Sequence, residues 1–412
     1  MTQQEAFTVI GRCPYAEDDA LLSPDPCASY LALKENSPVH RDEVLGVWFV
    51  TGFEEVGALL RHPGLTSEWP AHGRTVLHDD MGDGGDGPST LRTDETVRRW
   101  FMFNDGKRHK DLRNLVAPAL TADQLTRLRP FVRAEVDALL APVRERLEVM
   151  SELAVPLSSR VICHLLGLPR AVATELRAWG QEIAALLVAD YLPEVRTRGR
   201  QALREIEDAV HEALGGGELR EGSVLALLRE AHERGTICAA DVTAVASLLI
   251  YAGFETTSTF LGRAVVSVLH ANAWQGLRGD APEVVVEELL RFDTSVRQVA
   301  RVATRRIDIG GHRIAAGDLV LLMMGAADRD PRRFRDPDHL YLDRETGRHL
   351  AFGLGPHYCL GAGLARMEAQ VALQGLAASW RSAELAEPPV TSRHHGVPIL
   401  EEVHLRLTPL TG

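Results

Sequence analysis

The chain has 412 residues and carries 57 Asp and Glu against 45 Lys and Arg, which gives a formal net charge of −12. With 45% hydrophobic and 25% charged residues, the composition is that of an ordinary globular protein, and it excludes collagen-like, disordered and disulfide-scaffold classes. The acidic excess also argues against a general nucleic-acid-binding protein, because phosphate contacts need a cationic surface.

Neither the N-terminus nor the cysteines indicate export. The first residues lack the basic start and apolar stretch of a signal peptide. The longest apolar stretch, residues 242–254, is shorter than the roughly 18 residues that span a bilayer. Five scattered cysteines without C-x-x-C spacing indicate a reducing compartment and no structural zinc: Cys13, Cys27, Cys163, Cys238 and Cys359. We therefore expect a cytoplasmic protein without a membrane anchor.

Taken in chain order, the patterns predict a mostly helical protein. A glycine-rich surface loop is expected at 79–89 and another at 215–217. Apolar residues recur at helical spacing over 124–147, 171–188, 198–214 and 223–231. A longer helix is predicted over 241–269, about 43 Å in length, with Asp241 as its N-cap and Gly253 in its interior.

The character of the sequence changes after this helix. Residues 299–324 combine short apolar runs with glycine turns, which predicts short strands. No internal repeat and no long linker divides the chain. The sequence therefore predicts one domain over residues 1–412, mainly α with small β-sheets.

One cysteine lies in a distinctive context near the C-terminus. Residues 351–361 read AFGLGPHYCLG, and a helical pattern follows. A thiolate before a helix is stabilised by backbone N–H groups and by the helix dipole, and glycines let those groups approach the sulfur. Such a thiolate suits metal ligation. The alternative is that Cys359 is a small buried apolar side chain, so the spacing of its neighbours decides between the two.

The spacing resembles the F-G-x-G-x-H-x-C-x-G signature of the cytochrome P450 family, and the resemblance extends from about Tyr15 to the end of the chain. It implies the P450 fold, with the long central helix over a haem b. It further implies that Cys359 is the axial ligand of the haem iron, that Phe352 packs beside the thiolate and that His357 binds a haem propionate. The matched positions are Phe352, Gly353, Gly355, His357, Cys359 and Gly361.

The predicted central helix carries a second match. Residues 252–257 read AGFETT, which is similar to the family pattern A-G-x-E/D-T. The resemblance implies that Gly253 leaves room beside the haem, and that Glu255 and Thr256 deliver protons during catalysis. The alternative is that the polar residues only cap or interrupt a core helix.

A third match is the pair Glu288 and Arg291, which fits the structural E-x-x-R of the family. The spacing alone is weak evidence, because i, i+3 ion pairs are common on helix surfaces. In the family, an arginine in a stretch such as P-D-R-F usually completes the network around this pair. Here the corresponding residues are taken as 337–340, PDHL, with His339 as the substitute donor.

Basic residues of 107–113 resemble the H-x-x-x-R of another family helix. His109 and Arg113 lie one helical turn apart and share a face. With His357 and Arg301, they are the candidate donors to the two haem propionates. The remaining cations, Lys107, Arg108 and Lys110, form either a solvated face or a surface that attracts an acidic redox partner.

The substrate pocket is the least determined feature. By resemblance, Phe254 and Val296 lie near the distal face of the haem. Arg297 is expected to be a surface arginine; the alternative is that it meets a substrate carboxylate or phosphate.

The resemblance implies a monooxygenase that uses O2, and two electrons from a separate ferredoxin and ferredoxin reductase, to hydroxylate or epoxidise a small specialised metabolite. The chain contains no recognisable flavin or iron–sulfur module. The substrate is either free or bound to a carrier protein. One alternative keeps the haem but gives oxidative coupling, ring closure, nitration or peroxide-driven oxidation. Another, from a different class, is a non-catalytic haem sensor or recruiting protein.

Overall fold

The computed structural model describes residues 38–42, 46–68, 95–189, 192–216, 219–279, 282–394 and 397–410. The predicted loop at 79–89 and the first residues of the chain lie outside these ranges. The chain forms two compact units, one of Met1–Gly84 and Glu287–Cys359, the other of Gly85–Val286 and Leu360–Gly412. The expectation of a single domain stays a prediction.

The first unit is built on a five-stranded sheet in the order β1-β2-β8-β5-β3. β2 and β8 run parallel, with Trp48 opposite Val320, and the other pairs are antiparallel. The short strands predicted within 299–324 are therefore confirmed. The strands are β1 (Val39–Asp42), β2 (Val47–Val50), β3 (Leu65–Thr66), β5 (Val299–Ala303) and β8 (Leu319–Leu322), and β6 (Ile307–Ile309) pairs with β7 (His312–Ile314).

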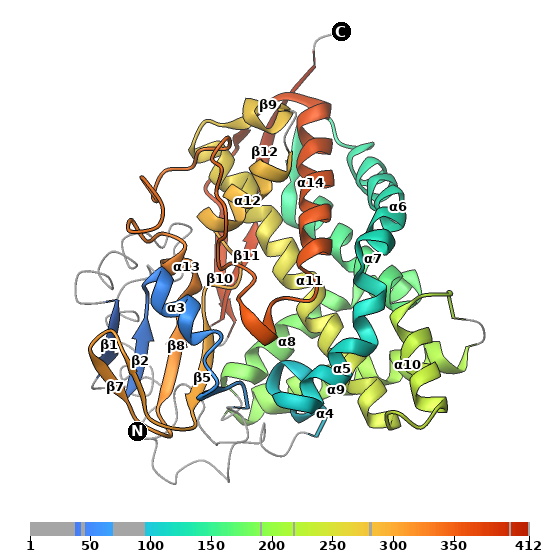
Figure 1. Ribbon diagram of the computed structural model, residues 1–412. Helices are drawn as coiled ribbons and strands as arrows, with labels where there is room; N and C mark the ends of the chain where they lie inside the picture. The colour runs from blue at the N-terminus through green and yellow to red at the C-terminus, as the bar shows by residue number, and fades with distance from the viewer. Residues whose placement is uncertain are drawn as a thin grey trace. The chain divides into compact units, whose positions relative to one another are not determined.

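Helix α3 (Phe53–Leu59) packs beside this sheet (Figure 1). Its apolar residues Phe53, Val56 and Leu59 share one core with Val320 and Leu322 of β8. α13 (Met324–Ala327) and the short turn η8 (Gly355–His357) also belong to this unit, as does the C-terminal half of α12 (Pro282–Phe292). The core holds α3 against the segment that leads to Cys359, because Leu350 belongs to the same cluster.

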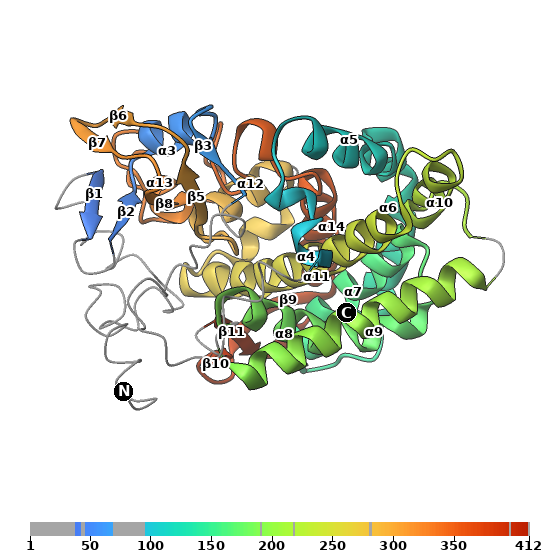
Figure 2. The ribbon, with the colours of Figure 1, turned by 90° about the horizontal axis from the view of Figure 1, so that it is seen from below.

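The second unit is a helical assembly around α11 (Ala239–His270). Figure 2 shows α11 lengthwise, with α8 and α9 along one side of it. The surrounding helices are α4 (Glu95–Arg98), α5 (Gly106–Val116), α6 (Ala122–Leu140), α7 (Val155–Leu166), α8 (Leu176–Ala189), α9 (Pro193–Gly215), α10 (Val224–Glu233) and α14 (Ala362–Ser379).

Two small sheets complete the second unit. One has the order β4-β12-β9 and the other pairs β10 with β11. Their bounds are β4 (Arg146–Glu148), β9 (Trp380–Leu385), β10 (Val390–His394), β11 (Val397–Glu402) and β12 (His404–Pro409). The architecture is mainly α with small sheets, as the sequence predicts.

Helix α11 is the core helix of its unit. By length and composition it could cross a membrane, but 67% of its most apolar window is buried within the fold, as expected for a core helix of a globular protein. Its start differs from the prediction. Cys238 is the N-cap, and Asp241 is the third helical residue, whose carboxylate accepts the Cys238 N–H in a capping box.

Other boundaries also differ. The helix predicted over 124–147 ends at Leu140, because Leu147 belongs to β4 and pairs with Leu405 of β12. The helix predicted over 171–188 is divided into a short turn, Arg170–Thr174, and α8. Helix α7 is absent from the prediction.

Candidate active site

The segment that carries Cys359 is a tight turn at the end of the first unit. Gly353 and Gly355 have φ angles of 69° and 78°, which residues with a Cβ rarely adopt. The Cys359 N–H closes the turn by donating to the Phe352 carbonyl oxygen at 2.9 Å. In the second unit, Gly361 is the N-cap residue of α14, and its carbonyl oxygen accepts the Ala365 N–H at 2.9 Å. The glycines of the signature therefore shape the turn.

Gly355 is needed for a second reason. A Cβ at this position would lie 3.0 Å from the Leu60 carbonyl oxygen and 2.9 Å from Cγ of Arg61, at the end of α3. This backbone approach leaves no room for a side chain. The turn is thus fixed by the core of the first unit as well as by its own torsion angles.

Cys359 and Cys163 lie in opposite environments. Cys163 is buried in α7, and burial raises the pKa of its thiol to about 12. Cys359 is exposed. The interpretation of Cys359 as a small buried apolar side chain is therefore wrong. Its thiol is accessible to a ligand, whereas the Cys163 thiol is not.

In the second unit, one short stretch of α11 is open although the helix is buried on both sides of it. Ala252 is exposed and Thr256, one turn later on the same face, is half-buried. The Thr256 hydroxyl donates to the Ala252 carbonyl oxygen at 2.9 Å. This hydroxyl is already placed within the helix and faces the open stretch, which suits a role in handling protons.

The structure gives a different reason for a glycine at position 253 from the one expected. A Cβ at this position would lie 2.6 Å from Cδ1 of Ile162 in α7. The glycine therefore allows α7 and α11 to pack closely, and the space it provides is taken by Ile162.

Glu255 lies on α11 in a largely desolvated position. Burial raises the pKa of its carboxyl to about 7, with Arg177 opposing the shift and Glu401 adding to it. The carboxyl lies against α8, because a Cβ at Gly180 would come within 3.0 Å of Oε2 of Glu255. A carboxyl that titrates near neutrality can accept and release protons at physiological pH.

Arg177 and Glu401, whose charges act on the pKa of this carboxyl, line a hollow on the surface of the second unit. Nη2 of Arg177 donates to Oε2 of Glu401 at 2.6 Å, and Ser392 donates to the other carboxylate oxygen at 2.7 Å. Both members of the ion pair line a hollow of about 650 Å³. Neither residue was found by the sequence analysis, because no local motif marks them.

In the first unit, Glu288 and Arg291 form a fully buried network. Arg291 donates to both carboxylate oxygens of Glu288, at 2.7 and 2.8 Å. Its remaining nitrogen donates to the carbonyl oxygens of Asp328 and Pro337 at 2.9 and 2.8 Å. The pair is therefore structural, which agrees with its complete burial.

The expected donor at His339 is wrong. Glu288 accepts instead from Nε of Arg344 at 3.0 Å and from the Thr346 hydroxyl at 3.0 Å. His339 contributes its carbonyl oxygen to Arg344, at 3.1 Å, while its ring stacks on Tyr341. The network does not need the imidazole of His339, since the guanidinium of Arg344 reaches the Glu288 carboxylate.

The four predicted propionate donors lie two in each unit. Arg301 is in β5 and His357 in η8, both half-buried, in the first unit. His109 and Arg113 share one face of α5 in the second, where the His109 ring is buried against Phe101. The combined role of the four stays a prediction.

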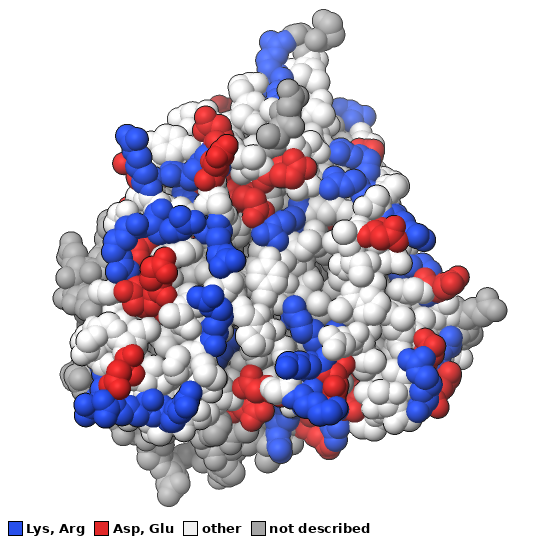
Figure 3. Space-filling model, in the orientation of Figure 1, with Lys and Arg blue, Asp and Glu red and all other residues white. Residues whose placement is uncertain are grey.

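The predicted basic cluster is partly neutralised within the second unit. Arg108 and Arg99 both bind the carboxylate of Asp241 at the start of α11, and Lys107 pairs with Asp111 at 2.5 Å. In the region of α5, Figure 3 shows a group of Lys and Arg side chains with a few Asp and Glu side chains beside it. Arg108 therefore anchors α5 to α11, and the cationic surface is smaller than the sequence suggests.

Two of the predicted pocket residues differ from expectation. Arg297 is not a surface arginine, because its side chain is only 10% exposed and pairs with Asp293 at 3.3 Å. Phe254 is 1% exposed, with its ring against Gly180, so it packs α11 on α8. Val296 is 36% exposed and remains available for a ligand.

The chemistry of these residues fits a haem. An accessible thiol lies in a turn that glycines hold open. The candidate donors are guanidinium and imidazole groups, which bind carboxylates. In the second unit, the open face of α11 presents a hydroxyl beside a carboxyl of raised pKa.

Comparisons with known proteins agree with this chemistry. The family profile of cytochrome P450 matches residues 283–382. The chain is 31% identical to the cytochrome P450 monooxygenase PikC of Streptomyces venezuelae, over 85% of this chain and 83% of that protein. Its structure resembles that of CalO2, with a TM-score of 0.84 at 31% identity, over 95% and 98% of the two chains. It also resembles P450BioI in complex with an acyl carrier protein bearing hexadec-9Z-enoic acid, with a TM-score of 0.80 at 28% identity, over 93% and 98%.

The chain belongs to the cytochrome P450 family, whose members carry a haem with a thiolate ligand. Within this family it is a bacterial-type monooxygenase, an oxidoreductase that inserts an oxygen atom from O2 into a small organic molecule by hydroxylation or epoxidation.

Proposed function

We propose that this chain binds haem b through the thiolate of Cys359 and oxidises a small specialised metabolite. When bound, the haem supplies the redox chemistry of dioxygen. The observation that carries the proposal is the exposed Cys359 thiol, which lies in a turn with two left-handed glycines. The residues of this chain then bind the cofactor, orient the substrate and move protons.

The two haem propionates require cationic or hydrogen-bonding partners. His109 and Arg113 lie on one face of α5, where both can donate to the same carboxylate. Arg301 and His357 are half-buried, so that a charge-assisted hydrogen bond to either is strengthened by partial desolvation. We assign these four side chains to the propionates.

Proton delivery is assigned to Glu255 and Thr256. The Glu255 carboxyl has a pKa of about 7, which suits both proton uptake and release. The two charges that shift its pKa belong to the Arg177–Glu401 pair, which lines the hollow on the surface of the second unit. The Thr256 hydroxyl holds the last proton at Oγ1, on the open face of α11.

The substrate is assigned to specialised metabolism, by analogy with PikC of Streptomyces venezuelae. Delivery on a carrier protein is supported by the likeness to P450BioI, whose solved complex contains an acyl carrier protein. We assign electron delivery to a separate ferredoxin and its reductase. We place the enzyme in the cytoplasm. Lys110, exposed on α5, belongs to the surface that such an acidic partner meets.

The decisive experiment measures the carbon monoxide difference spectrum of the reduced protein. Cys359→Ala should abolish the thiolate–haem band. Cys238→Ser is a matched control, because Cys238 is also exposed but caps α11, and it should leave the band unchanged. A retained band in Cys359→Ala would overturn the assignment.

A second experiment identifies the type of product. Turnover under ¹⁸O-labelled dioxygen should give a product that contains one labelled oxygen atom. A product without label would favour oxidative coupling or ring closure, which insert no oxygen.

A further inference from the structure

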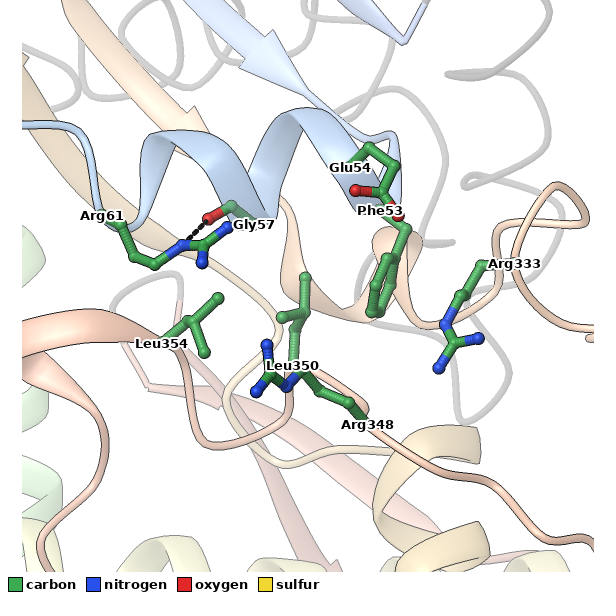
Figure 4. Close-up of a pocket in the computed structure, with 8 residues that line it drawn as sticks. All are labelled: Phe53, Glu54, Gly57, Arg61, Arg333, Arg348, Leu350 and Leu354. Atoms are coloured by element: carbon green, nitrogen blue, oxygen red, sulfur yellow. Dashed lines mark hydrogen bonds between the residues drawn. The ribbon is translucent and has the colours of Figure 1, made fainter.

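Three arginines surround one hollow of the first unit. The hollow has a volume of about 320 Å³ and is lined by Arg61, Arg333 and Arg348, with Glu54 as its one carboxylate. Its apolar floor includes Leu350 and Leu354 (Figure 4). None of these residues has been assigned above to the haem, to proton transfer or to the substrate. We refer to this hollow as the arginine cavity.

Within the described parts of the chain, none of the three arginines forms an ion pair with a carboxylate. Arg348 makes no hydrogen bond or ion pair with any described residue. Arg61 donates from Nε to the Gly57 carbonyl oxygen at 3.1 Å, and this is its one side-chain hydrogen bond among the described residues. Arg333 lies over the rings of Phe53 and Phe334, at 5.3 and 5.4 Å.

Neighbouring arginines are satisfied in a different way. Arg332, next to Arg333, binds Glu55 at 2.8 Å and Asp330 at 2.7 Å. Arg344, four residues before Arg348, binds Glu288 at 3.0 Å. In a chain with a net charge of −12, carboxylates are plentiful, yet the arginines of the cavity have none as partners in the described structure. Such a concentration of uncompensated charge favours an anionic occupant.

Packing contacts hold the arginines of the cavity in place. Stacking on two aromatic rings holds the guanidinium of Arg333 in place, and a Cβ at Gly347 would lie 3.3 Å from its Nη2. The stem of Arg61 packs over Gly355, as described above. In Figure 4 the guanidinium of Arg348 lies near the two leucines, with Arg61 on one side and Arg333 on the other.

We propose that the arginine cavity binds a small organic anion that carries a phosphate group. Guanidinium groups bind phosphate oxygens through two parallel hydrogen bonds. With three arginines and one glutamate, the lining favours a ligand with at least two negative charges. The volume is at the lower end of the roughly 300–1,000 Å³ of small-molecule sites, and the apolar floor accepts the uncharged part of the ligand.

The site goes beyond the proposed function and does not rest on it. Its lining joins α3 to the segment 348–354, which continues into the Cys359 turn. An occupant that contacts both is expected to stabilise the first unit against unfolding, since a ligand that binds only the folded state raises its stability.

The test is calorimetric titration of the purified haem-loaded enzyme with inorganic pyrophosphate at constant ionic strength. We expect one saturable site. Arg348→Gln should weaken it about tenfold, the value of one lost charge-assisted hydrogen bond. Arg335→Gln is the matched control, because it removes the same charge from a 95% exposed side chain that pairs with Asp336 outside the cavity; it should leave the affinity unchanged.

Three outcomes would overturn the proposal. Equal weakening in both variants would show that binding reflects diffuse charge. Citrate binding as tight as that of pyrophosphate would exclude a preference for phosphate. Absence of pyrophosphate binding, together with binding of an acidic [2Fe–2S] ferredoxin that Arg348→Gln weakens, would make the cavity a protein-docking surface instead.

Discussion

Arg177 of α8 and Glu401 of β11 form a 2.6 Å ion pair whose two charges act in opposite directions on the buried carboxyl of Glu255. Arg177 lowers the pKa of Glu255 and Glu401 raises it. Glu401→Gln should therefore shift the limb of the pH–activity profile that reports Glu255 to lower pH, and Arg177→Gln should shift it to higher pH.

The control for these variants is Glu402→Gln. Glu402 is adjacent in sequence, but its carboxylate pairs with His404 at 2.8 Å and is not among the charges that shift Glu255. Its profile should match that of the wild type. Shifts of the same sign in the Arg177 and Glu401 variants would mean that the limb reports another group.

Thr256→Ala should reduce the amount of product formed per electron pair consumed. The hydroxyl at the open face of α11 is lost, while the backbone of the helix keeps its own hydrogen bonds. Thr256→Ser should restore much of the coupling. Thr243→Ala is the control, because Thr243 makes the same kind of bond, to the Ala239 carbonyl oxygen at 3.4 Å, in a buried part of α11. Coupling that is unchanged in Thr256→Ala would place the proton donor elsewhere.

Arg344→Ala should destabilise the fold by about 3 kcal/mol, the usual cost of breaking a buried ion pair by removing one partner. The Arg344 side chain is 14% exposed and the Glu288 side chain 0%, so that little solvent can replace the lost donor. His339→Ala should change the free energy of unfolding by less than about 0.5 kcal/mol, because only the backbone of His339 takes part. Urea unfolding measures both. A larger effect in His339→Ala than in Arg344→Ala would contradict this account of the network.

Glu368→Gln should change how stability depends on pH. Glu368 is buried in α14, and burial raises the pKa of its carboxyl from its ordinary value of 4.5 to about 8. Between these values the unfolded chain releases the proton while the folded chain retains it, so stability falls as pH rises through this interval. The free energy of unfolding of Glu368→Gln minus that of the wild type should therefore grow as pH rises from 4.5 to about 8.

The matched control for Glu368 is Glu384→Gln. The Glu384 side chain is 64% exposed and pairs with Arg406 on the surface. Its stability should run parallel to that of the wild type over the same pH interval. A difference between Glu368→Gln and wild type that does not vary with pH would show that the carboxyl has an ordinary pKa in the folded protein.

Much of the candidate site could be predicted because its information is local. The Cys359 turn needs glycines at Gly353 and Gly355 for torsional reasons that hold in any context. The central helix is long and apolar enough to be recognised without knowledge of its neighbours. The strands of 299–324 show apolar runs separated by the pair Gly310–Gly311 and by Gly317.

The parts that were missed depend on contacts far along the chain. Leu147 belongs to a strand because Leu405 pairs with it. Arg344 is one of several arginines between β8 and the Cys359 turn, and only folding selects it as the partner of Glu288. Helix α7 is a different case: Arg160 and His164 lie one turn apart outside its buried face, so its helical period is present in the sequence and was overlooked.

Gly180 of α8 has a consequence for how this enzyme can be altered. Its missing side chain leaves space that Phe254 and Glu255 fill from α11. A methyl group at this position would displace the Phe254 ring and the Glu255 carboxyl together, without changing a residue of α11. A substitution at position 180 is therefore expected to move the Glu255 carboxyl while the signature motifs stay unchanged.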